Sequence, residues 1–186
     1  MIAKAPRQRA HRPSRIEVKM SLIVEDGRWR KDKGWLRLIR RAARRALDAS
    51  PRAAFRVNSS AKQGVAGRGV TVLLAGDARL RKLNREFRGH NKPTNVLSFP
   101  SSSADYLGDV ALAYETVARE AKAQGKAFPH HAAHLAVHGI LHLLGYDHQQ
   151  RIDAKDMELL EIIIMEQLGL ADPYAARPLT IRPKAA

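Results

Sequence analysis

The sequence contains no cysteine, which rules out disulfide bridges and thiolate metal ligands. It also lacks any run approaching about 18 apolar residues, so no segment has the length and composition of a membrane-spanning helix. Acidic residues are few, since 18 Asp and Glu stand against 33 Lys and Arg, for a formal net charge of +15. The absence of cysteine fits the reducing cytoplasm, where we expect the protein to act. The excess of positive charge predicts that it binds a polyanion. Nucleic acid is the first candidate partner and an anionic membrane surface the alternative.

The chain is expected to form one domain, which we place at residues 16–170. Residues 1–15 are rich in arginine and contain proline, but they have no acidic residue and no apolar stretch of the kind a secretory signal needs. We expect a charged arm there, either solvated or in contact with the polyanion, and an organellar transit peptide is the alternative. Residues 171–186 are expected to form a C-terminal tail.

Hydrophobic periodicity predicts a mixed α+β fold with about four strands and four to five helices. The predicted strands are Ile16–Val24, Val70–Leu74, Val96–Phe99 and Gly108–Tyr114. The predicted helices are Trp35–Ala49, Ala78–Phe87 with Asp77 as its N-cap, Glu115–Lys126, Pro129–Leu144 and Asp153–Leu168. A glycine-rich loop is expected at Ala61–Gly69. The helix at 129–144 is the most apolar, so we expect it at the centre of the domain.

The helix predicted at residues 35–49 carries basic side chains along its outer face. They are Arg37, Arg40, Arg41, Arg44 and Arg45. Like charges on one helix repel each other, so this pattern favours an anion-binding surface. We take Arg37, Arg41 and Arg44 as candidate substrate contacts, and a merely solvated helix face is the alternative.

Three histidines lie near the end of the most apolar predicted helix, at positions 138, 142 and 148. His138 and His142 are one helical turn apart, about 6 Å, so both imidazoles face the same side. Gly145 predicts the end of the helix, after which the chain can turn and bring His148 towards the pair. Three nitrogen ligands and an open position are typical of catalytic zinc, so we predict one Zn²⁺ per chain held by these residues. The alternative is that they are incidental core or surface histidines.

Two other positions of this stretch bear on the prediction. His134 lies one turn before His138 but about 12 Å along the axis from His142, so we place it beside the metal site and outside its ligand set. Gly139 stands where the long zinc motif of metzincin proteases has its general-base glutamate, which argues against ordinary proteolysis. Glycine costs a helix up to about 1 kcal/mol relative to alanine. A bulky substrate or a closely packed element is therefore expected to approach the backbone there.

A polar loop is predicted at residues 88–93, between a helix and a strand. Loops held between rigid elements often carry binding residues, and a guanidinium can grip a phosphate with two parallel hydrogen bonds. Arg88 and Lys92 are therefore candidate phosphate contacts.

Three blocks of sequence follow one another in a specific order. They are LNREFRGHNKPTNVLSFP at 83–100, LGDVALAYETVAREA at 107–121 and HLAVHGILHLLGYDH at 134–148. Together they resemble the YbeY family of bacterial endoribonucleases. The resemblance implies that His138, His142 and His148 are the zinc ligands and that Arg88 is the functional arginine, so Arg88, His138 and His142 are the expected catalytic residues. The N-terminal arm and the residues after about 169 lie outside the resemblance.

The resemblance implies a zinc-dependent, single-strand-specific endoribonuclease that acts in 16S ribosomal RNA 3′-end maturation and ribosome quality control. Its expected partners are single-stranded RNA, ribosomal RNA and the small ribosomal subunit, with no membrane and no DNA. Because no glutamate follows His138, the nucleophile is either a water activated by the metal or the 2′-OH of the substrate. A zinc metalloprotease-like hydrolase and a ribosome assembly factor with a structural zinc are the alternative functions.

Overall fold

The computed structural model describes residues 17–49, 67–103, 105–146 and 151–175. The predicted N-terminal arm lies outside the described residues, and so does the C-terminal segment at 176–186. His148 also lies outside them.

Four strands form one mixed sheet in the described part of the chain. They are β1 (Glu17–Val24), β2 (Gly67–Ala75), β3 (Val96–Pro100) and β4 (Tyr106–Ala113). Their order is β1-β2-β4-β3, with β1, β2 and β4 parallel and β3 antiparallel to β4. In this sheet β3 is an edge strand, and the Ser98 main-chain oxygen on its outer side accepts a hydrogen bond from Arg88.

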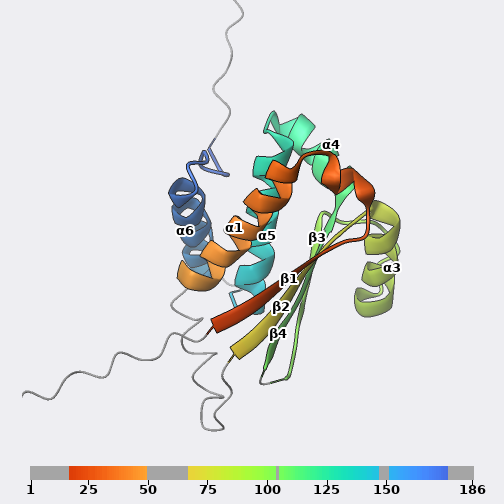
Figure 1. Ribbon diagram of the computed structural model, residues 1–186, viewed down its shortest axis with the longest axis horizontal. Coiled ribbons are helices and arrows are strands. Elements are labelled where there is room, and N and C mark those ends of the chain that lie inside the picture. Colours follow the sequence, from red (N-terminus) through yellow and green to blue (C-terminus); the bar gives the residue numbers. More distant parts are fainter. Residues whose placement is uncertain (1–16, 50–66, 104, 147–150, 176–186) are drawn as a thin grey trace, which may run out of the picture.

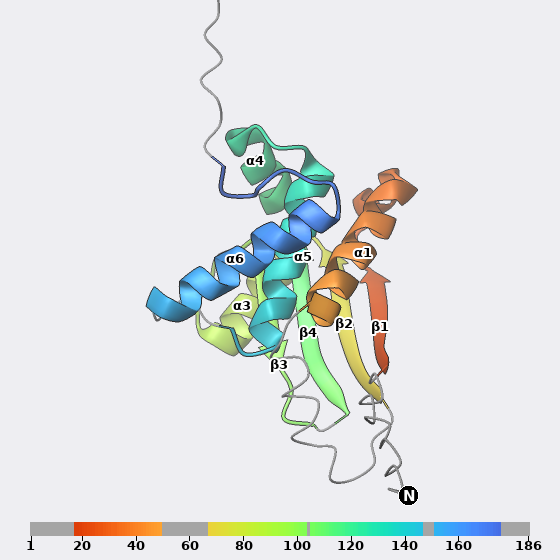
Figure 2. The same ribbon diagram turned by 90° about the vertical axis from the view of Figure 1, so that its left-hand side faces the viewer.

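Five α-helices and one short 3-10 helix accompany the sheet in the described residues. They are η1 (Gly27–Lys31), α1 (Lys33–Ala49), α3 (Asp77–Arg88), α4 (Tyr114–Gln124), α5 (Phe128–Leu143) and α6 (Arg151–Gln167). Helices α1, α5 and α6 lie on one side of the sheet and α3 on the other (Figure 1), and α6 crosses the outer side of α5 (Figure 2). The predicted α+β fold with a single domain is confirmed.

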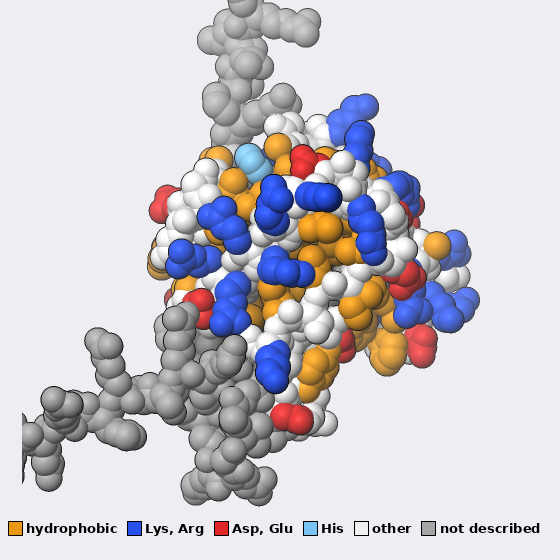
Figure 3. Space-filling model, in the orientation of Figure 1, with side chains coloured by type: hydrophobic (Ala, Val, Ile, Leu, Met, Phe, Trp, Pro, Cys, Tyr) orange, Lys and Arg blue, Asp and Glu red, His pale blue; other side chains and the backbone are white. Residues whose placement is uncertain are grey.

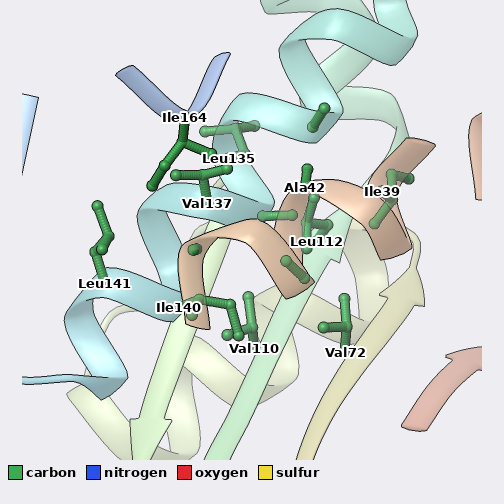
Figure 4. Close-up of a cluster of buried hydrophobic side chains, with 14 of the residues drawn as sticks. Ile39, Ala42, Val72, Val110, Leu112, Leu135, Val137, Ile140, Leu141 and Ile164 are labelled. Carbon is green, nitrogen blue, oxygen red and sulfur yellow. The ribbon is translucent and has the colours of Figure 1, made fainter. Parts of the chain in front are cut away.

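The central position of α5 comes from its apolar side chains, which are buried along most of the helix. Figure 4 shows Ile140 of α5 next to Val110 of β4, and both side chains are fully buried. On its other sides α5 packs against α1 and α6. Because such interiors are close-packed, α5 and the histidines it carries are held in one position relative to the sheet.

The start of β2 differs from the sequence prediction. The glycine-rich composition predicts a loop through Gly69, but β2 already begins at Gly67, and the earlier part of that loop lies outside the described residues. Glu17 of β1 pairs with Gly67, so the parallel ladder with β1 overrides the weak strand preference of glycine.

Asp77 has a different role from the predicted N-cap. The N-cap of α3 is Gly76, and Asp77 is the first residue of the helix. The Asp77 carboxylate accepts hydrogen bonds from the main-chain N–H and the hydroxyl of Thr116, at 3.0 and 2.7 Å. In return, the main-chain N–H of Asp77 donates to the Glu115 carboxylate at 2.8 Å. The first turns of α3 and α4 therefore satisfy each other's main-chain N–H groups, which a local sequence pattern does not reveal.

The buried face of α6 also differs in one residue. The sequence pattern predicts an inward face of Met157, Leu160, Ile163, Ile164 and Leu168. Met157, Ile164 and Leu168 are buried and Leu160 is partly buried, but Ile163 is 36% exposed and Met165 is buried. The stripe that faces the domain thus runs through 157, 161, 164, 165 and 168, and it includes the charged residue Glu161, which is 0% exposed.

No helix among the described residues is long and apolar enough to cross a membrane.

Candidate functional site

His138 and His142 point their imidazoles at one another from successive turns of α5. Their Nε2 atoms are 3.1 Å apart, and both side chains are partly buried. Two nitrogens bound to one zinc at about 2.0–2.1 Å with tetrahedral angles lie about 3.3 Å apart. The spacing of the pair therefore matches the spacing that a shared metal ion requires.

The other ring nitrogen of each histidine is held by an acceptor. His138 Nδ1 donates to Oε1 of Glu161 at 2.8 Å, and His142 Nδ1 donates to the carbonyl oxygen of Tyr146 at 3.0 Å. When Nδ1 carries the proton, Nε2 presents its lone pair, which is the form of histidine that binds metals. When both imidazoles are neutral and protonated at Nδ1, their Nε2 lone pairs face each other at this distance, and a cation between them would bind both. The chemistry of the pair thus fits a metal ion.

Gly145 sets the turn that brings the Tyr146 carbonyl to His142. Its φ of 87° lies in the left-handed region that glycine adopts readily. The N–H of Tyr146 donates to the carbonyl of Leu141 at 3.1 Å, which closes the end of α5. The helix end predicted from Gly145 is confirmed, with α5 ending at Leu143.

Glu161 of α6 connects several groups behind the pair. Its Oε2 accepts from His134 Nε2 at 2.8 Å and from the hydroxyl of Tyr174, while Oε1 accepts from His138. Burial raises the pKa of the Glu161 carboxyl, but the hydrogen bonds from His134 and His138 outweigh burial and bring the pKa to about 2. Glu161 is therefore a buried anion, whose negative charge favours a cation at the neighbouring imidazoles.

The third predicted ligand, His148, lies outside the described residues. Among the residues that are described, no group of three or more His, Cys, Asp or Glu side chains is arranged to hold a metal ion. His134 is turned to Glu161, on the side of the carboxylate away from the contact with His138. The described part of the site is thus a supported histidine pair, meaning His138 and His142 with their Nδ1 atoms held by Glu161 and by the Tyr146 carbonyl.

Gly139 is required by close packing against the sheet. A Cβ at this position would lie 2.5 Å from Val110 Cγ1 and 3.2 Å from the hydroxyl oxygen of Ser98. Of the two explanations for this glycine, the structure supports the neighbouring element and not a bulky substrate. A glutamate in its place would be directed at β4 and β3.

We expect Gly139→Ala to lower the free energy of unfolding by about 1–3 kcal/mol through overpacking, offset in part by the better helix propensity of alanine. Urea denaturation of both proteins measures the difference. Gly27→Ala is the matched control, since a Cβ at Gly27 meets nothing within 4 Å. Equal stability of the Gly139→Ala protein and wild type would contradict the packing role.

Arg88 is the last residue of α3, and its exposed side chain reaches the outer edge of β3. Its Nη2 donates to the main-chain oxygen of Ser98 at 3.4 Å, and the Ser98 hydroxyl donates to the carbonyl of Gly139 at 3.0 Å. Gly139 directly follows His138. The structure therefore brings Arg88 to the edge strand next to α5 through one intervening residue.

The other candidate substrate contacts lie on other parts of the fold, in the loop before β3 and on α1. Lys92 is exposed in the loop before β3, where Asn84 holds its main-chain carbonyl at 2.8 Å. Arg37 and Arg41 are exposed on α1, and Figure 3 shows Lys and Arg side chains spread over the face to which α1 belongs. Arg44 instead donates to the Val18 carbonyl at 2.5 Å and is half-buried, so it ties α1 to β1.

Glu161, Tyr174 and the Tyr146 carbonyl are parts of the site that sequence reasoning missed. A signal for Glu161 was present, because this residue falls on the same helical face as Met157, Ile164 and Leu168. A charged residue on an apolar face needs a buried partner. Tyr174 belongs to the segment predicted as a tail, yet it reaches Glu161, and Lys126 donates to the Pro173 carbonyl at 2.6 Å.

Fold and site define a small, strongly basic α+β protein with a supported histidine pair on its central helix and an arginine at the neighbouring sheet edge. The family model described as Endoribonuclease YbeY matches residues 38–169. The chain belongs to the YbeY endoribonuclease family.

Two endoribonuclease relatives agree with this membership. Endoribonuclease YbeY of Bradyrhizobium diazoefficiens is 49% identical over 137 residues, which cover 68% of this chain and 75% of the relative. Endoribonuclease YbeY of a Chelativorans species is 51% identical over 113 residues, covering 57% of this chain and 69% of the relative. A solution structure of a Thermotoga maritima protein matches with a TM-score of 0.49 at 21% identity, covering 85% of this chain and 99% of that one.

Proposed function

We propose that this protein is a zinc-dependent endoribonuclease that cleaves single-stranded RNA. The observation that carries the proposal is the histidine pair, with its Nε2 atoms 3.1 Å apart and both Nδ1 atoms held by acceptors. The family relatives carry the name endoribonuclease, and the net charge of +15 suits an RNA substrate. The proposed biological setting is 16S ribosomal RNA 3′-end maturation and ribosome quality control in the cytoplasm, with the small ribosomal subunit as partner.

His138 and His142 would hold the zinc ion, together with His148. Zinc bound there would supply Lewis-acid chemistry, lowering the pKa of a bound water and neutralising charge on a phosphoryl oxygen. The role of Glu161 and the Tyr146 carbonyl is to hold the imidazole rings in the orientation and protonation state that ligation needs.

Arg88 would bind the phosphate that is cleaved or its neighbour. Its contact with the Ser98 carbonyl is long, at 3.4 Å, and the side chain is exposed, so the guanidinium can exchange this contact for a phosphate. Negative charge builds on the phosphoryl oxygens in the transition state. The planar guanidinium of Arg88 would stabilise this charge with two parallel hydrogen bonds.

RNA is favoured over a peptide as the substrate for two reasons. The glutamate that serves metzincin proteases as general base is replaced by Gly139, and the packing of Gly139 against Val110 leaves no space for a side chain there. The chain is strongly basic, which attracts the phosphodiester backbone of a nucleic acid more than an average peptide.

Purified protein incubated with labelled single-stranded RNA, with the matching duplex and with casein, each with and without a chelator, tests the proposal. We expect cleavage of the single strand alone, and its loss with chelator. Casein hydrolysis would support the protease alternative. RNA binding without cleavage would support an assembly factor with a structural zinc.

Elemental analysis tests the metal site itself. We expect about one zinc per chain in wild type and a large loss in His148→Ala. His134→Ala should keep most of the metal, because His134 is turned to Glu161 and not to the Nε2 pair. Loss of zinc in His134→Ala equal to that in His138→Ala would show that the ligand set is a different one.

A further inference from the structure

A cavity of about 750 Å³ lies on the α3 side of the sheet, opposite the side that α5 covers. Its size falls in the range of about 300–1,000 Å³ that is usual for sites of small ligands. The walls are mostly apolar and come from all four strands and α3. They include Ile23, Leu73, Leu83, Phe87, Phe99 and Arg88.

Two of these apolar side chains are unusually exposed. Phe87 is 61% exposed and Ile23 is 52% exposed. The ring of Phe87 lies against Phe99, with 5.1 Å between the centroids and an angle of 60° between the planes. Large apolar groups gathered at an open cavity mark binding sites on soluble proteins, and the exposed ring of Phe87 offers a flat face for another ring.

Polar groups stand at defined places around this apolar surface. Thr71 and Asp109 lie on the floor, and the hydroxyl of Tyr106 contacts both of them, at 2.7 Å from the Thr71 hydroxyl. At one end Arg79 is paired with Glu25, with 3.4 Å between Nε and Oε2. At the other end is Arg88, the proposed phosphate ligand and the last residue of α3, whose side chain contacts the Ser98 carbonyl of the edge strand β3.

We propose that this cavity receives one unpaired nucleobase of the RNA strand, stacked on Phe87, while Arg88 holds the adjacent phosphate. A base has a flat apolar face that can stack on the ring of Phe87, and stacking of bases on aromatic side chains is a common means of binding single strands. The position of Arg88 at the mouth connects the cavity to the path of the backbone. This inference rests on the proposed endoribonuclease function and adds a base-binding pocket to it.

The pocket explains why a duplex would be a poor substrate. A base can enter the cavity only when it is unstacked and unpaired, and extracting it from a duplex costs a few kcal/mol. Asp109 adds a preference among bases, because a carboxylate accepts hydrogen bonds from the amino groups of adenine, cytosine and guanine. Uracil has only its ring N3–H as a donor and carries no amino group, so we expect it to bind less tightly.

The inference is tested by measuring how tightly the protein binds short labelled oligoribonucleotides. Fluorescence anisotropy is recorded after rapid mixing, before cleavage products accumulate. The probes are oligoadenylate, oligouridylate and a strand of equal length built from abasic ribose phosphates. We expect Phe87→Ala to weaken oligoadenylate binding roughly tenfold or more and to leave the abasic strand unchanged. Wild type should bind oligoadenylate more tightly than oligouridylate, and Asp109→Asn should reduce this difference.

Two controls separate stacking from general damage. Phe87→Tyr keeps the aromatic face and should retain most of the affinity. Leu159→Ala removes another exposed apolar side chain, 56% exposed on α6, and should change nothing. Unchanged oligoadenylate binding in Phe87→Ala, or equal weakening of the abasic strand, would overturn the base pocket, and the cavity would then suit a protein partner.

Cleavage by wild type is measured in parallel with zinc present. Absence of cleavage would count against the proposed function, whatever the result at Phe87. Normal cleavage by wild type together with unchanged oligoadenylate binding by Phe87→Ala would contradict the base pocket and leave the proposed function standing.

Discussion

Arg88→Lys is expected to reduce single-turnover RNA cleavage about a hundredfold, although the positive charge is retained. Lysine lacks the planar fork that binds two phosphoryl oxygens at once, and this fork contributes most when charge builds in the transition state. Loss of one such contact typically costs about 3 kcal/mol, which corresponds to this rate change. RNA affinity should fall much less, and zinc content should stay the same.

The measurement compares cleavage at saturating RNA with RNA binding, for proteins of matched zinc content. Arg85→Lys is the control, because Arg85 is exposed on the same helix and is absent from the cavity lining. Normal cleavage by Arg88→Lys at saturating RNA would make Arg88 a binding residue only. Lys92 and His90, in the loop after α3, would then be the next candidates for catalytic charge.

Glu161→Gln is expected to weaken zinc binding about 10–100-fold, the usual cost of losing the carboxylate behind a ligating histidine. Glutamine keeps the size of the side chain but removes the negative charge. Its amide offers one oxygen and one NH₂ group, so it cannot accept from His134 and His138 through two oxygens as Glu161 does. Cleavage should fall at limiting zinc and recover when zinc is raised.

Competition with a zinc-binding dye measures this affinity. Glu166→Gln is the matched control, since Glu166 is exposed on the same helix. Circular dichroism of both variants shows whether the fold is kept, because a buried glutamine left with an unpaired group also destabilises the protein. Wild-type zinc affinity in a folded Glu161→Gln protein would limit Glu161 to a packing role.

The elements of the fold follow closely from the sequence. Alternating and helical hydrophobic patterns predict all four strands and the five helices of the described residues, with differences mainly at element ends. The order β1-β2-β4-β3 does not follow from them, because strand pairing depends on contacts between distant segments. The exchange of hydrogen bonds between Asp77 and Thr116 is of the same kind, since it joins the starts of two helices.

What the sequence by itself determined about the site is its local geometry. The four-residue spacing of His138 and His142 places both rings on one face of a helix, and Gly145 ends that helix, because helix pitch and the left-handed conformation of glycine act within a few residues. His148 stays a predicted ligand. The family resemblance predicts Arg88 as a further site residue.

Only the tertiary structure decided which groups support that geometry. Glu161 reaches His138 from another helix, Val110 and Ser98 explain Gly139, and the cavity beside Phe87 is assembled from four strands and α3. These contacts join residues far apart in the chain. They form because burial of the apolar faces of α5, α6 and the sheet brings those residues together, and no local periodicity encodes which polar groups then meet.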